Sequence, residues 1–132
     1  MRCLWFILVS LFLAQGAAAQ TQITPEAFLD RAVGNTLTFN DSQDGHVVGV
    51  EKFLRRNQSV WAPEDGYCSY GKITIRGPLI CFLYEDYPDP NNCWMPFMDE
   101  RGLLVMSRSS FQVQRITAID DTPVVCEDAP IS

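Results

Sequence analysis

Short β-type runs separated by turn residues fill the chain from Asn35 onward, and they constrain its fold more than any other feature. The runs are Thr36 to Phe39, His46 to Leu54, Ser59 to Ala62, Tyr67 to Ile75, Leu79 to Glu85, Cys93 to Met98, Leu103 to Ser107 and Phe111 to Ile119. This spacing predicts a mainly β protein, an antiparallel meander closing into a small barrel or a strongly curved sheet, because closure removes exposed edge strands. A two-sheet sandwich is the alternative.

The last run changes its apolar register partway along. The apolar positions shift from Phe111 and Val113 to Ile116 and Ala118. Such a shift predicts a β-bulge near Gln114-Arg115.

One short N-terminal helix is predicted over Pro25 to Val33, ahead of the β-type runs. Thr24 is a favourable N-cap, proline is tolerated at the first helical position, and Glu26 suits the first turn. Gly34 ends the segment. The apolar residues of this helix share one face, so we expect it to lie against the sheet.

The first residues, Met1 to Ala19, are typical of a cleavable secretory signal peptide. Arg2 precedes the apolar run Leu4 to Val9, and Ala17-Ala18-Ala19 suits cleavage between Ala19 and Gln20. A membrane anchor is the alternative, but the apolar stretch is roughly half of the about 20 residues that a spanning helix needs. We therefore expect an exported protein, periplasmic or secreted, with no stable membrane anchor after signal removal and a single domain over residues 20–132.

Four cysteines remain in that domain, namely Cys68, Cys81, Cys93 and Cys126. An even number of cysteines in an exported domain predicts two disulfide bonds. A structural zinc site is the competing interpretation, but the spacings lack the close C-x2-C pair that such sites use. Of the three possible connectivities we favour Cys81 with Cys93 and Cys68 with Cys126, since the second pair would hold the C-terminal tail.

The charge balance is acidic. Without Arg2, the chain has 9 Lys and Arg against 16 Asp and Glu, a net charge of about −7. Nucleic acid is therefore not an expected partner, because its phosphate backbone requires a basic face.

An ordered set of residues resembles a known group of proteins. The set is Val50-Glu51, Val60-Trp61, Asp65-Gly66-Tyr67-Cys68, Gly71, Ile80-Cys81-Phe82-Leu83-Tyr84-Glu85 and Cys93-Trp94. It resembles small uncharacterised exported (periplasmic) proteins of alphaproteobacteria over most of residues 20–132. The resemblance implies a periplasmic location and the cysteine framework, and it carries over no activity, ligand or functional residue.

Catalytic signals are weak. A Ser-His or Cys-His mechanism would have to use His46, the single histidine, and no G-x-S-x-G motif is present. A hydrolase that uses two carboxylates remains an alternative, because Glu51, Glu85 and Asp86 lie on or beside predicted strands. We predict no catalytic residue, no resident metal and no cofactor.

The segment between Cys81 and Cys93 is the most suggestive local feature, because a disulfide between them would make it rigid, and rigid loops often bind ligands. The candidate residues for binding a ligand or partner are Tyr84, Glu85, Asp86, Tyr87, Asp89, Asn91 and Trp94. The side-chain oxygens of Asp86, Asp89 and Asn91 suit calcium, but their spacing matches no EF-hand loop, and Pro-Asp-Pro-Asn favours plain turn chemistry.

Aromatic residues gather in the middle third of the chain, where they either form the core or line a pocket at a barrel mouth. They are Trp61, Tyr67, Tyr70, Phe82, Tyr84 and Trp94. Core packing is the favoured interpretation.

The function we predict is a non-enzymatic extracytoplasmic binding module, a monomer that binds a protein partner or a small ligand. The alternatives are an inhibitor of a secreted hydrolase and a small carboxylate-dependent hydrolase. A carrier requires an apolar cavity that reaches the surface, and a hydrolase requires two carboxylates facing one cleft.

Overall fold

The structure is a computed structural model that describes residues 19–124 and residue 126. The predicted signal peptide therefore lies outside the described residues except for Ala19. The elements are β1 (Thr21–Gln22), α1 (Pro25–Ala32), β2 (Thr36–Asp41), β3 (Val47–Arg55), β4 (Gln58–Pro63), β5 (Ser69–Arg76), β6 (Leu79–Tyr84), β7 (Cys93–Asp99), β8 (Gly102–Ser107) and β9 (Val113–Asp120).

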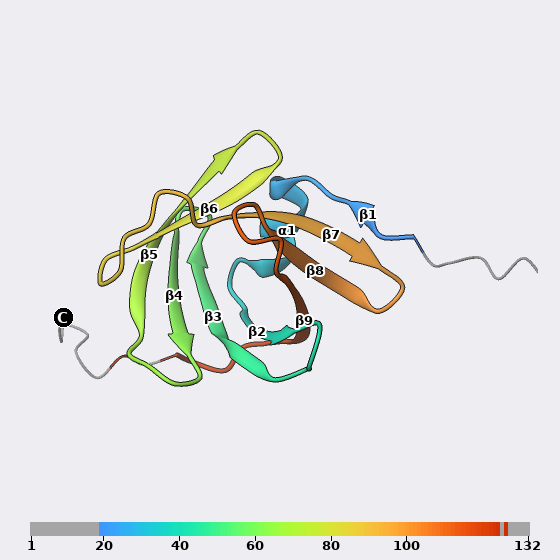
Figure 1. The fold of residues 1–132 in the computed structure, drawn as a ribbon. Coiled ribbons are helices and arrows are strands. Elements are labelled where there is room, and N and C mark those ends of the chain that lie inside the picture. The colour runs from blue at the N-terminus through green and yellow to red at the C-terminus, as the bar shows by residue number, and fades with distance from the viewer. Residues whose placement is uncertain (1–18, 125, 127–132) are drawn as a thin grey trace, which may run out of the picture.

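The sheet is a closed antiparallel barrel of 8 strands (Figure 1). From β2 to β9 each strand pairs with the next one in the chain, and β9 returns to pair with β2. The short β1 pairs with the second half of β7, beyond the residues of β7 that pair with β6. The prediction of a mainly β meander closing into a barrel is confirmed, and the sandwich is not what the chain forms.

The predicted bulge is present, but it lies at Thr117 and not at Gln114-Arg115. Thr38 is opposite Ala118 and Phe39 is opposite Ile116, so Thr117 is the extra residue in β9. The prediction was displaced because it counted Phe111 and Val113 as inward strand residues, whereas Gln114 and Ile116 are the buried residues of β9. Phe111 instead lies in the β8–β9 loop with φ 61°, and its side chain is 65% exposed.

Helix α1 covers one end of the barrel. Thr24 caps it, with the Thr24 Oγ1 accepting a hydrogen bond from the Ala27 N–H at 3.1 Å. The buried face consists of Pro25, Phe28, Leu29 and Ala32. Phe28 packs edge-on against Phe53 of β3 with 6.0 Å between ring centroids. The helix was predicted over Pro25 to Val33 and ends at Ala32, so the prediction is confirmed to within one residue. No helix within the described ranges is long and apolar enough to cross a membrane.

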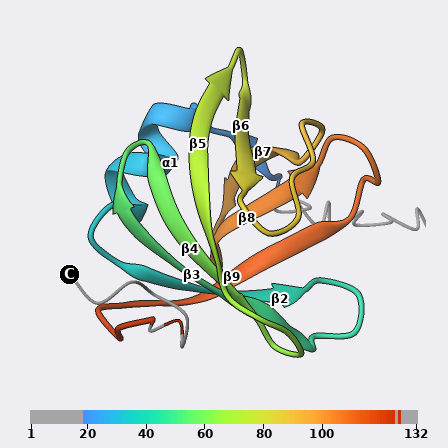
Figure 2. The same ribbon diagram turned by 90° about the vertical axis from the view of Figure 1, so that its left-hand side faces the viewer.

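The other end of the barrel carries four hairpin loops. In an antiparallel meander alternate connections lie at the same end, so loops 42–46, 64–68, 85–92 and 108–112 lie together, opposite the end that α1 covers. Figure 2 shows α1 on the left of the barrel and the 42–46 and 108–112 loops on its right. We refer to this end as the mouth.

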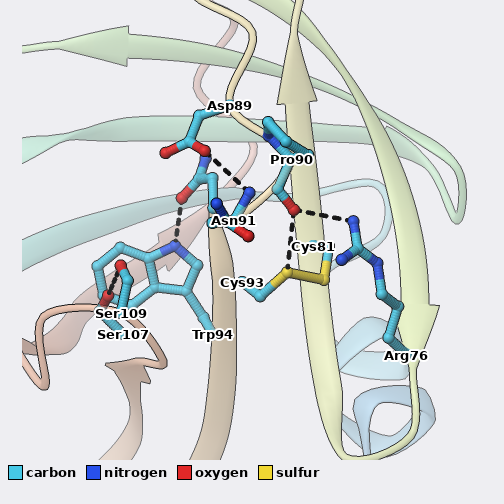
Figure 3. The surroundings of a disulfide bond; sticks show 10 residues. Arg76, Cys81, Asp89, Pro90, Asn91, Cys93, Trp94, Ser107 and Ser109 are labelled. Atoms are coloured by element: carbon cyan, nitrogen blue, oxygen red, sulfur yellow. Dashed lines mark hydrogen bonds between the residues drawn. A yellow bond between two sulfur atoms is a disulfide. The ribbon is translucent and has the colours of Figure 1, made fainter.

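Both favoured disulfide pairs are present. Cys81 and Cys93 are directly opposite each other on β6 and β7, with 4.0 Å between their Cα atoms. Cys68 and Cys126 are joined with 5.5 Å between their Cα atoms, which ties the C-terminal region to the start of β5. The Cys81–Cys93 bond closes the base of loop 85–92 (Figure 3).

Burial of the helix face predicts that Phe28→Ala destabilises the fold. Phe28 is 1% exposed, and truncating a buried phenylalanine costs about 3 to 5 kcal/mol. The free energy of unfolding in urea measures this loss. Phe111→Ala is the matched control, because an exposed phenylalanine should change stability by no more than about 0.5 kcal/mol. Equal losses for the two variants would contradict the role assigned to α1.

Candidate functional site

The barrel encloses a cavity of about 170 Å³. Its walls are mostly aromatic. The lining residues are Phe28, Phe39, Glu51, Trp61, Ile80, Phe82, Tyr84, Tyr87, Asn92, Trp94, Val105 and Gln114. Four of the six middle-third aromatics are therefore wall residues, whereas Tyr67 is 85% exposed and Tyr70 lies outside the lining set.

The cavity runs from the helix towards the mouth. Phe28 of α1 contributes at the closed end, and Tyr87 and Asn92 of loop 85–92 contribute at the mouth. Tyr87 is 43% exposed, so the cavity reaches the surface beside its ring. The loop bracketed by the Cys81–Cys93 disulfide is thus the rim of the cavity.

Glu51 of β3 is the acidic group inside the cavity. It is 3% exposed, and its Oε1 accepts hydrogen bonds from the Ser59 hydroxyl at 2.6 Å and the Tyr84 hydroxyl at 2.8 Å. Burial raises the pKa of Glu51 from 4.5 to about 7, although the two hydrogen bonds lower that pKa in part. The carboxyl group is therefore poised between its neutral and charged forms near neutral pH.

The second carboxyl oxygen of Glu51, Oε2, is free to accept hydrogen bonds from a bound molecule. Both hydrogen bonds go to Oε1, and no group in the described part of the chain donates to Oε2. Every fully buried side-chain oxygen of the described residues has a hydrogen-bond partner. Because Oε2 has none, it is not fully buried and is accessible from the cavity. A bound molecule with a donor group has a place to form a hydrogen bond.

Gly71 allows Tyr84 to reach Glu51. Tyr84 on β6 is opposite Gly71 on β5, which is in turn opposite Ser59 on β4. A Cβ atom at Gly71 would lie 2.7 Å from Cε1 of the Tyr84 ring, so the ring lies directly over the glycine. Because no side chain intervenes, the phenol extends across β5 towards β3 and donates to the carboxylate.

Gln114 of β9 brings a second polar group to the cavity wall. It is 6% exposed, and its side-chain amide forms no hydrogen bond with the described residues. Since every fully buried side-chain nitrogen or oxygen of the described residues has a partner, the unpartnered amide atoms are accessible from the cavity. The amide therefore offers donor and acceptor groups to a bound molecule.

The rim is held by local contacts. The Tyr87 ring packs against Tyr84 with 5.4 Å between centroids, and the Trp94 Nε1–H donates to Asn92 Oδ1 at 2.7 Å. An Arg76 guanidinium N–H also donates to the Pro90 carbonyl at 2.9 Å (Figure 3). These contacts fix the aromatic rim over the cavity.

The predicted binding residues divide into two groups. Tyr84, Tyr87 and Trp94 line the cavity. The side chains of Glu85, Asp86, Asp89 and Asn91 are exposed and outside its lining. Asp89 accepts a hydrogen bond from the Asn91 backbone N–H at 2.9 Å, an ordinary turn contact.

Sequence reasoning missed most of the polar residues of the cavity. Asn92 and Gln114 of the lining, and Ser59, which donates to Glu51, were not predicted as binding residues, and among functional roles Glu51 was considered only as a member of a catalytic pair. Among the lining residues Glu51 is the single carboxylate, since Glu85 and Asp86 lie outside the cavity. Glu51 lies two residues before the buried Phe53, so the alternation of a strand places both side chains on the inner face. This alternation was the one feature of the sequence that indicated a buried Glu51.

Asp41, Asp44 and His46 form a separate group at the mouth, with one ligand-type atom of each within 4.8 Å of the others. Asp41 Oδ1 accepts hydrogen bonds from the backbone N–H groups of Gln43 and Asp44, and the hydrogen bond with Asp44 raises the pKa of His46. These contacts account for the group as the chemistry of an exposed hairpin turn.

Comparison with known proteins gave no match, whether to a protein-family model, a curated protein or a solved structure.

The raised pKa of Glu51 makes stability depend on pH. The folded protein holds this proton more tightly than the unfolded chain, so the free energy of unfolding falls as pH rises from about 4.5 to about 7. We expect Glu51→Gln to remove that dependence, with an advantage over the wild type that grows to about 3 kcal/mol by pH 8. Urea unfolding at several pH values measures it. Parallel pH profiles of the two proteins would contradict the assignment.

The contact between Tyr84 and Gly71 gives a further prediction. Gly71→Ala should displace the Tyr84 ring, lower the free energy of unfolding by about 1 to 3 kcal/mol and raise the pKa of Glu51. An NMR titration of the Glu51 carboxyl carbon measures the pKa. Tyr84→Phe is the matched control, because it removes the same hydrogen bond and should raise the pKa without a new methyl group. An unchanged pKa in Gly71→Ala would show that the glycine does not position the phenol.

Proposed function

We propose that this protein is a binding protein that holds one small ligand inside its barrel. The observation that carries the proposal is a cavity of about 170 Å³ whose aromatic wall is interrupted by Glu51 and Gln114, two side chains with unused hydrogen-bonding capacity. Ligand sites of proteins have this composition, a mainly apolar wall with a few polar groups that set orientation.

The cavity size limits the ligand to about one ring. An apolar cavity of about 150 Å³ accommodates benzene, and the volume here is similar. Barrels of eight strands either fill their interior with side chains or hold one small ligand. The Glu51 and Gln114 side chains favour the second use, because an interior built for stability alone has no need of them.

The alternatives have less support. A hydrolase with two carboxylates would need a second acid in the cavity, and the lining residues include Glu51 alone. An inhibitor would present loop 85–92 to its target, but Tyr87 and Asn92 in that loop face the cavity. A ligand-binding cavity accounts both for the single carboxylate and for the inward position of Tyr87 and Asn92.

The proposed function belongs outside the cytoplasm. Two disulfide bonds favour an oxidising compartment, in agreement with the signal peptide that the sequence predicts. We therefore propose export to the periplasm or medium, with the ligand met there.

Single-ring probes test the proposal. We expect at least one of benzyl alcohol, benzylamine and benzoate to shift the NMR resonances of the cavity residues in a saturable way. Gln114→Trp should abolish the shifts by filling the cavity, and Gln114→Phe provides a smaller replacement should the larger ring prevent folding. Thr74→Trp is the matched control, since Thr74 is exposed on β5 and should leave binding intact. Saturation by no probe, or equal saturation in folded Gln114→Trp, would overturn the proposal.

A further inference from the structure

The charge inside the cavity is not balanced by the protein. Glu51 is the one lining residue within the described ranges that carries a charge near neutral pH, because burial raises the pKa of Tyr84 and Tyr87 above 10. None of the ion pairs there includes it; they join His46 with Asp44, Arg56 with Asp30 and Arg115 with Asp99. A buried carboxylate without a cation costs several kcal/mol, so it either takes up a proton or meets a positive charge from outside.

The aromatic wall is suited to a positive charge. The faces of Trp and Tyr rings attract cations, and Trp61, Tyr84 and Trp94 line the same space as Glu51. Tyr87 adds another ring at the rim. An ammonium group beside Glu51 would thus be surrounded by groups that favour it.

The mouth is strongly acidic, independently of the cavity. Its four loops carry six carboxylates against one arginine, Arg108, with all seven side chains exposed. The six are Asp44, Glu64, Asp65, Glu85, Asp86 and Asp89. At the opposite end the turns 56–57, 77–78 and 100–101 carry Arg56 and Arg101 against Glu100. The negative potential is therefore concentrated where a ligand passes, which raises the local concentration of cations and lowers that of anions.

We propose that the ligand is a compact organic ammonium ion, whose N–H group donates to the free oxygen of Glu51 and whose carbon skeleton packs among the aromatic rings. This inference rests on the proposed function and specifies its ligand class. The cavity limits the skeleton to about one ring, and the Gln114 amide is available to a second polar group of the ligand.

Comparing benzylamine with a neutral and an anionic relative tests the ammonium proposal separately from the proposed binding function. Benzylamine is a cation near neutral pH, benzyl alcohol has nearly the same shape without charge, and benzoate has the opposite charge. By calorimetry at pH 7.5 we expect benzylamine to bind at least about tenfold more tightly than benzyl alcohol, and benzoate to bind least. Glu51→Gln should remove the preference for the amine. Glu100→Gln, the same change at the opposite end, should leave it intact.

The pH dependence gives a second readout. Because the amine requires the charged carboxylate, its affinity should fall about tenfold per pH unit below about pH 7 in the wild type and stay flat in Glu51→Gln. The groups that face Glu51 are Ser59, Tyr84 and Tyr87, and none of them titrates in this range. His46 at the mouth gains charge as pH falls, but it does so equally in both proteins.

The outcomes are distinct. Equal or tighter binding of benzyl alcohol would overturn the ammonium proposal and leave the cavity as a site for neutral ligands. Absence of binding by all three probes would overturn the proposed function itself. Preference for the amine that persists in Glu51→Gln would also overturn the inference, because it would place the recognition in the mouth loops and not in the cavity.

Discussion

The pairing of β2 with β9 is the constraint on which the rest of the molecule depends. It runs from Thr36 opposite Asp120 to Asp41 opposite Gln114 and joins the first strand of the meander to its last. Without it the sheet would have two exposed edges and no interior. Closure at eight strands sets an interior width that side chains nearly fill, so a modest deficit of side-chain volume leaves space for one small molecule. Helix α1 then closes one end, and the cavity reaches the surface at the other end beside Tyr87.

Local signals account for the part of the fold that the sequence predicts. Thr24 accepts a hydrogen bond from one of the free N–H groups at the start of the helix, and Pro25 has no N–H group that would need a partner. Both effects involve only neighbouring residues. Turn residues mark the hairpins in the same way, which is why the strand order follows the chain. The pairing of Cys81 with Cys93 is local as well, because the two cysteines lie opposite each other on consecutive strands. The bulge was placed wrongly because the polar Gln114, and not the apolar Val113, points into the barrel, and an apolar pattern does not indicate this.

The cavity could not be predicted because it depends on register across several strands. In β3 the alternation of side chains is broken at Val48, an extra residue between Val47 and Gly49 opposite β2. An unbroken alternation starting at Val48 would place that residue and Val50 inside and Glu51 outside. The structure instead buries Glu51 and Phe53. The partners of Glu51 come from β4 and β6, so their meeting follows from barrel closure and from the close approach at Gly71, and neither is visible in a run of residues.

A carboxyl group inside a small barrel works against stability, since an apolar side chain of similar size would avoid both the desolvation cost and the loss of stability at neutral pH. Such a conflict between local chemistry and overall fold is expected at functional sites. In the proposed binding of a cation, the acidic loops and Glu51 would act at different stages. Charges at the mouth would attract such a ligand over a distance of about 10 Å, so they would govern the association rate and its dependence on salt. Glu51, buried in the cavity, would govern dissociation. A cation would therefore be gathered by one set of charges and retained by another, with the rim formed by Tyr87 between them.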